Sequence, residues 1–157
     1  MELYDWLLAL HVLSAFAWIA ALVIYSVLVA ALWRTSLPSD VVRLFRVSRA
    51  GDALTAVGMI GTIVFGIWLA LDEYEIWDGW IIAALALWIV AAAIGGRTGA
   101  TYKVVNDRAR SLVADGEDAP SSEFAALARS SRGLVLHVAG SLVTLAILVV
   151  MVYKPGA

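Results

Sequence analysis

Four long apolar runs restrict what this chain can fold into. They cover about residues 6–33, 53–71, 79–96 and 133–153. A helix needs about 20 residues to cross the roughly 30 Å hydrocarbon core of a bilayer. Lipid cannot satisfy the backbone groups at a sheet edge, so an open sheet is excluded. We therefore predict an all-α membrane protein that forms a single four-helix transmembrane bundle.

The composition agrees with this prediction. Hydrophobic residues make up 62% of the chain and charged residues 15%, whereas soluble domains are about half apolar and about a quarter charged. The excess apolar surface must face lipid. The chain has no cysteine, which excludes disulfides, cysteine-ligated zinc, iron–sulfur clusters, thiolate-bound haem and thiol catalysis. Redox chemistry would therefore need a bound cofactor.

The basic residues gather in two connections, 34–52 and 97–132, and only Lys154 lies elsewhere. The short connection between the second and third runs is instead acidic. Lys and Arg residues mark the cytoplasmic loops of membrane proteins. We predict that both basic connections are cytoplasmic loops, that the N-terminus and the C-terminus are outside, and that the protein crosses the membrane several times.

The second basic connection contains signals for further helix. Residues 101–114 have a basic helical pattern, and Ser121 or Ser122 is placed to cap a second segment. Both segments are expected to extend the neighbouring transmembrane helices rather than to form a domain. The glycine-rich stretch 95–99 is expected to end the third transmembrane helix.

Small residues predict where helices pack, because lipid tails give no hydrophobic incentive for helices to associate. Gly58, Thr62 and Gly66 recur at four-residue spacing in the second run. We predict that they form a helix-packing ridge. One hypothesis is therefore a non-enzymatic membrane component, which forms a homo-oligomer or joins a membrane protein partner through this ridge.

The two histidines are the main candidates for chemistry. No acidic or basic residue lies in the middle of a predicted helix, which argues against a proton relay or an ion-coupled carrier. His11 shares a helical face with Ser14, Trp18 and Tyr25, and this face is expected to point into the bundle. His11 is either a hydrogen-bonded structural residue or an axial ligand or substrate contact. His137 is either an interfacial residue or a second cofactor-binding residue.

A haem held by both histidines is disfavoured by their depths. His11 is predicted near the outer end of the first helix and His137 near the inner end of the last. A rise of about 1.5 Å per residue in a core of about 30 Å separates them by roughly 15 Å in depth. We therefore expect a site at each end of the bundle or a site with a single histidine.

Short motifs in all four runs carry a resemblance to a known group of membrane proteins. They are Leu10-His11-Val12-Leu13, Ala17-Trp18-Ile19-Ala20, Leu54-Thr55, Gly66-Ile67-Trp68-Leu69, Gly79-Trp80 and Val152-Tyr153-Lys154-Pro155. In this order they resemble a bacterial four-helix integral membrane family of uncharacterised function, which is related to HemJ-type protoporphyrinogen oxidases and CopD-like domains.

The resemblance implies a multi-pass protein of a bacterial-type cytoplasmic (inner) membrane that binds haem or a porphyrin within the bilayer. It also leaves open a redox role. Haem b is the implied cofactor, and His11 is the implied metal ligand or substrate contact. Trp18, Trp88 and His137 are further candidates for cofactor binding. HemJ-type proteins place a lysine early in helix three, and Ala84 stands near that position here. The resemblance thus favours the uncharacterised branch and leaves open whether the protein is an enzyme.

The CopD likeness also permits copper or small-solute passage. Met59 and Met151 are the only sulfurs within the runs, and they do not repeat at metal-ligand spacing, so this expectation is the weaker one. The expected partners of the chain are the lipid bilayer, a second copy of the chain and a membrane protein, and no nucleic acid.

Overall fold

The computed structural model describes residues 3–155 and is helical along most of this range. The helices are α1 (Leu3–Leu32), α2 (Pro38–Glu73), α3 (Gly79–Ala114), α4 (Ser122–Ala128) and α5 (Ser131–Tyr153). The described residues contain no strand, and four of their helical segments are long and apolar enough to cross a membrane. The predicted all-α bundle of four transmembrane helices is thus confirmed.

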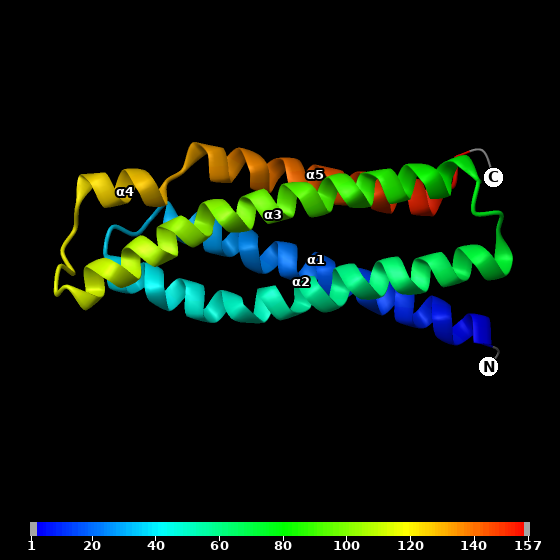
Figure 1. Ribbon diagram of the computed structural model, residues 1–157, viewed down its shortest axis with the longest axis horizontal. Helices are drawn as coiled ribbons and strands as arrows, with labels where there is room; N and C mark the ends of the chain where they lie inside the picture. Colours follow the sequence, from blue (N-terminus) through cyan, green and yellow to red (C-terminus); the bar gives the residue numbers. More distant parts are fainter. Residues whose placement is uncertain (1–2, 156–157) are drawn as a thin grey trace.

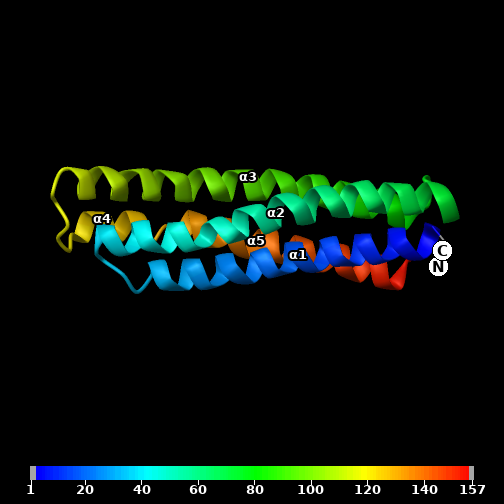
Figure 2. The ribbon, with the colours of Figure 1, turned by 90° about the horizontal axis from the view of Figure 1, so that it is seen from below.

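The long helices lie along one axis in two antiparallel pairs (Figure 1 and Figure 2). α1 packs mainly on α2, and α3 packs mainly on α5, whereas α1 and α5 touch little. Both termini lie at the end of the bundle that holds the α2–α3 connection, and the two basic connections lie at the opposite end. We call these the terminal end and the basic end. An even number of crossings produces this arrangement, and the cytoplasmic position of the basic end stays a prediction.

α2 and α3 are longer than the apolar runs that they contain. Each has 36 residues, or about 54 Å at 1.5 Å per residue, against a hydrocarbon core of about 30 Å. α2 begins at Pro38, inside the connection expected at 34–52, because proline is well suited to the first helical turn. α3 continues through residues 95–99 to Ala114, so the expectation that these glycines end the helix is wrong.

A hydrophobic cluster at the basic end explains why α3 continues. Val105, Ala109 and Leu112 of α3 are buried there against α1, α2 and α4. Glycine within a helix costs about 1 kcal/mol relative to alanine, whereas burying one large aliphatic side chain contributes about 1.5–3 kcal/mol. The tertiary contacts beyond the glycines therefore outweigh their local helix-breaking tendency.

α4 is a single short helix that covers this cluster. Its Phe124 and Ala128 are buried. The Ser121 side chain accepts a hydrogen bond from the Phe124 backbone N–H at 3.4 Å, so the predicted cap is confirmed at Ser121. Ser130 caps α5 in the same way through the Gly133 N–H at 3.1 Å. These two caps set the sharp turn by which the chain leaves the cluster and enters α5.

Glycines of α2 bring α1 unusually close. A Cβ atom at Gly58 would lie 2.5 Å from the Trp18 backbone nitrogen. A Cβ at Gly66 would lie 3.0 Å from Cε1 of His11, and one at Gly61 would overlap the Ser14 side chain. The ridge predicted at Gly58, Thr62 and Gly66 therefore faces α1 of the same chain. This surface is not available to a second copy, so an oligomer would need another face.

Candidate functional site

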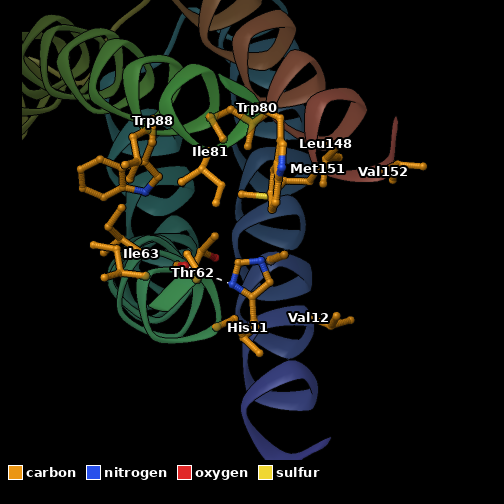
Figure 3. Close-up of a pocket in the computed structure, with 18 of the residues that line it drawn as sticks. His11, Val12, Thr62, Ile63, Trp80, Ile81, Trp88, Leu148, Met151 and Val152 are labelled. Atoms are coloured by element: carbon orange, nitrogen blue, oxygen red, sulfur yellow. Dashed lines mark hydrogen bonds between the residues drawn. The ribbon is translucent and has the colours of Figure 1, made fainter. Parts of the chain in front are cut away.

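A cavity of about 550 Å³ lies within the terminal half of the bundle. All four long helices contribute to its mostly apolar lining, and Figure 3 shows the side chains that α1, α2, α3 and α5 direct toward it. We call it the terminal cavity. Cofactor and small-molecule sites typically measure about 300–1,000 Å³ and have apolar walls with a few placed polar groups. The terminal cavity has this size and character.

His11 is the imidazole in its wall, and α2 fixes the orientation of the ring. Its Nδ1 atom lies 3.1 Å from the backbone oxygen of Thr62. A carbonyl oxygen only accepts, so the Nδ1–H donates, and a neutral ring then carries its lone pair on Nε2. Gly66 leaves the space beside the ring that a side chain would fill. Figure 3 shows the imidazole anchored on Thr62 at one side and open to the cavity at the other.

Three buried polar atoms in the wall have no hydrogen-bond partner among the described residues. They are Thr62 Oγ1, Trp80 Nε1 and Trp88 Nε1. The hydroxyl of Ser14, by contrast, has a hydrogen-bond partner, because it donates to the backbone oxygen of Leu10 at 2.7 Å. A buried polar group without a partner costs about 1–3 kcal/mol. Each of these three atoms carries that cost in the described residues, and none has appreciable surface open to the cavity.

The other predicted wall residues lie at the inner end of the terminal cavity. Trp18 is buried in a cluster with Ala91 and Ile147, and Trp88 packs against this cluster. Both residues line the cavity, and their predicted role in cofactor binding stays a prediction. Met151 of α5 also lines it, so one thioether faces the space that His11 faces (Figure 3).

A cation lies at the mouth of the terminal cavity. Lys154 ends α5 with a left-handed backbone (φ 42°), and its Nζ donates to the Tyr74 hydroxyl at 2.6 Å. The same Nζ lies 4.5 Å from the Tyr74 ring centre and 5.4 Å from that of Trp80. The two rings meet edge to face with centres 5.2 Å apart. Cation–π and hydrogen-bond contacts thus hold one positive charge at the cavity entrance.

His137 lies in a second cavity of about 470 Å³, in the basic half of the bundle. Its Nε2 atom is 2.9 Å from Oγ of Ser26, which itself donates to the Leu22 oxygen at 2.8 Å, so the imidazole N–H donates to the hydroxyl. Trp18 and Thr144 line both cavities, but each histidine lines only one. The structure therefore keeps His11 and His137 apart, as the depth argument expected, and it places Trp18 and Trp88 in the lining of the cavity that His11 lines.

Sequence reasoning missed the residues at the mouth. Tyr74, Trp80 and Lys154 come from three separate segments, and only the pairing of α3 with α5 brings them together. One signal was present, because Lys154 is the only basic residue outside the two basic connections. No periodic pattern connects it with the two rings.

The side chains of the described residues do not form a metal site with several protein ligands. Residues 3–155 contain no group of three or more His, Cys, Asp or Glu side chains placed to hold a metal ion. A metal beside His11 would therefore have to bring most of its own ligands, as the iron of a tetrapyrrole does. Met59 and Met151 line different cavities.

These features define a class, an integral membrane protein of four transmembrane helices with an open cavity in each half. Comparison with protein families narrows the class to one family. The chain belongs to the family described as a predicted integral membrane protein (DUF2269), whose model matches residues 5–155. No curated protein and no solved structure matches the chain. The family match places the protein in a lipid bilayer, and the relation to HemJ-type and CopD-like proteins remains a hypothesis.

Proposed function

We propose that this protein binds a tetrapyrrole, with haem b as the cofactor, in the terminal cavity beside His11. The observation that carries the proposal is the orientation of the imidazole. The Nδ1–H is used by the Thr62 carbonyl, so Nε2 is left as the ligand atom. Metal-ligating histidines commonly hold their second nitrogen in this way, because the contact fixes both the tautomer and the ring.

The remaining lining fits the chemistry of haem. Its flat ring is apolar, and its two carboxylates project from one edge. Apolar residues of the four long helices would surround the ring, with the indoles of Trp18 and Trp88 at the inner end. The Lys154 ammonium at the mouth would pair with a carboxylate. Met151 would be the candidate for a second ligand to the iron, since His and Met together ligate haem in some electron-transfer proteins.

The proposal extends to a redox role but not to porphyrinogen oxidation. Bound haem would supply one-electron chemistry that the protein's own side chains lack. Ala84 is buried and lines the terminal cavity near the position where the HemJ resemblance implies a lysine. Without that amine, we favour haem binding or electron transfer over oxidation of a porphyrinogen substrate.

The two other hypotheses have less support. An oligomer built on Gly58, Thr62 and Gly66 would compete with α1 for the same face. Copper or small-solute passage would use the thioethers of Met59 and Met151, which line separate cavities. Neither hypothesis accounts for the oriented imidazole of His11.

A visible spectrum of the purified protein tests the proposal. We expect a Soret band either on purification or on titration with haemin in detergent micelles. His11→Ala should abolish the band or shift it, whereas His137→Ala should retain it, because His137 lines the other cavity. Both variants should keep the wild-type far-ultraviolet circular dichroism. No Soret band in the wild type, or an unchanged band in His11→Ala, would rule the proposal out.

A further inference from the structure

The second cavity, which we call the basic cavity, is not used by the proposed function. It measures about 470 Å³ and lies between the two helix pairs in the basic half of the bundle. Its lining begins among apolar residues such as Trp18 and Leu22 and ends at residues of the extended parts of α2 and α3. It therefore joins the hydrocarbon region to the polar region beyond it.

One wall of the basic cavity is bare backbone of α3. Gly95, Gly96 and Gly99 all line it, and a Cβ atom at any of them would meet nothing within 4 Å. The glycines of α2 differ, because Gly58 and Gly66 are needed for the close approach of α1. Each helical glycine costs about 1 kcal/mol, and on α3 no close contact with the described residues offsets that cost. These glycines keep open a space that a slender apolar group can occupy.

The other end of the basic cavity is positively charged. Arg49, Lys103 and Arg110 line it together with one carboxylate, that of Asp52. The Tyr25 hydroxyl donates to this carboxylate, which holds it to α1. Three basic side chains against one acidic one leave an excess of two positive charges with His137 neutral. The charge selects for an anionic ligand.

Two buried polar atoms in the lining lack a partner among residues 3–155. They are the hydroxyl of Tyr102 and Oδ1 of Asn106. Tyr102 itself is only 5% exposed. Neither atom has appreciable accessible surface, and the Tyr102 hydroxyl lies beside Gly133 of α5, where an added Cβ would be 2.9 Å from it. The charged groups that a ligand in this cavity can reach are therefore the exposed Arg49, Lys103 and Arg110.

We propose that the basic cavity is a binding site for an anionic phospholipid. Its phosphate lies among Arg49, Lys103 and Arg110, and one acyl chain lies along the glycine wall of α3. Basic pockets between transmembrane helices recognise anionic headgroups by this combination of charge and apolar depth. The apolar wall distinguishes such a lipid from a free phosphate ion, which has no part to place there. This inference does not depend on haem binding in the terminal cavity.

Native mass spectrometry of the full chain tests the proposal. The protein is released from detergent after incubation with phosphatidylglycerol, with phosphatidylcholine of the same acyl chains, or with inorganic phosphate. We expect one phosphatidylglycerol to be retained at much lower lipid concentration than phosphatidylcholine, and phosphate alone not to be retained. Arg110→Gln should weaken phosphatidylglycerol retention about fivefold, the effect of one cation near an anionic headgroup.

Matched variants distinguish a specific binding site from a general effect of surface charge or of added side-chain volume. Arg108 is exposed on the same helix but does not line the basic cavity, so Arg108→Gln should leave retention unchanged. A Cβ at Gly99 would meet nothing within 4 Å, so Gly99→Leu extends into the space along the glycine wall, and it should abolish retention while preserving helicity. Ala100→Leu, on an exposed residue outside the lining, is its control.

The proposal is overturned by any of three results. Equal retention of phosphatidylcholine would show that charge does not select the ligand. Equal losses in Arg108→Gln and Arg110→Gln would assign the effect to the surface as a whole. Unchanged retention in a folded Gly99→Leu variant would show that no acyl chain uses the wall. Because Arg110 is exposed, its substitution tests the charge requirement even if a variant at Gly99 fails to fold.

Discussion

The Nδ1 atom of His11 lies 3.1 Å from the backbone oxygen of Thr62, and this contact joins α1 to α2 inside the bundle. The oxygen belongs to the backbone, so no side-chain substitution removes the acceptor. A substitution at the neighbouring Gly66 can disturb the contact instead, because a Cβ there would lie 3.0 Å from Cε1 and 3.2 Å from Nδ1 of the ring. A substitution in α2 can therefore test whether the orientation of the imidazole is needed for ligand binding.

Gly66→Ala should weaken haem binding. The added methyl group displaces the His11 ring from the Thr62 oxygen, and loss of such a supporting contact typically costs about tenfold or more in metal affinity. Haemin titration followed at the Soret band measures the effect. Gly79→Ala is the control, since a Cβ at Gly79 meets nothing within 4 Å. Equal affinity in both variants would mean that the orientation of the ring is not used for binding.

Gly58→Ala should destabilise the packing of α1 on α2. Its Cβ would lie 2.5 Å from the Trp18 backbone nitrogen, so the helices must separate. Overpacking of this kind costs about 1–3 kcal/mol, measurable by unfolding in mixed detergent and dodecyl sulfate micelles. Gly96→Ala has open space around it and should instead be stabilising by about 0.5–1 kcal/mol. Destabilisation of equal size in both variants would contradict the assigned contact.

Lys154→Gln should remove the preference of the terminal cavity for a ligand with free carboxylates. Wild-type protein is expected to bind haem about tenfold more tightly than its dimethyl ester, the size of one charged hydrogen bond. The variant should bind the two equally, because the uncharged amide favours neither form. Arg132→Gln, exposed on α5 and outside the cavity, should behave as wild type. A retained preference in Lys154→Gln would place the carboxylate elsewhere.

Asp118 should make the start of α2 sensitive to acid. Its carboxylate accepts the Ser39 backbone N–H at 2.9 Å. Hydrogen bonds from Ser39, with a smaller contribution from the charge of Arg43, lower the pKa of Asp118 below its ordinary value of 3.8. A lowered pKa in the folded state means that the contact is fully present above pH 3.8 and is lost as the pH falls through the folded pKa.

Hydrogen exchange of the Ser39 amide checks this prediction. At pH 6, Asp118→Asn should exchange this amide faster than the wild type, because the neutral amide oxygen is a weaker acceptor than a carboxylate. Glu117→Gln should leave its protection unchanged and serves as the control. Full protection of the Ser39 amide in Asp118→Asn would show that the carboxylate does not hold the start of α2.

The surroundings of His11 show which contacts the spacing of residues along one helix can predict. The offsets of Ser14 and Trp18 from His11 correctly place all three on the side of α1 that faces α2, since helical periodicity is a local property. The spacing did not predict which residues of α2 contact this side of α1. Gly61, which lies against Ser14, does not belong to the four-residue series that the sequence suggested. The rotation of each helix is set by how the two surfaces fit together.

Linear patterns were enough to predict the four membrane-spanning segments and the return of both termini to one end, because apolar length and the number of crossings decide these features. They also predicted a cap at Ser121 or Ser122, and the structure has it at Ser121. The packing of the helices was needed to show that α3 continues past its glycines and that His11 and His137 line separate cavities. It also brought Lys154 to Tyr74. Contacts between distant segments depend on helix pairing and rotation, which no local pattern specifies.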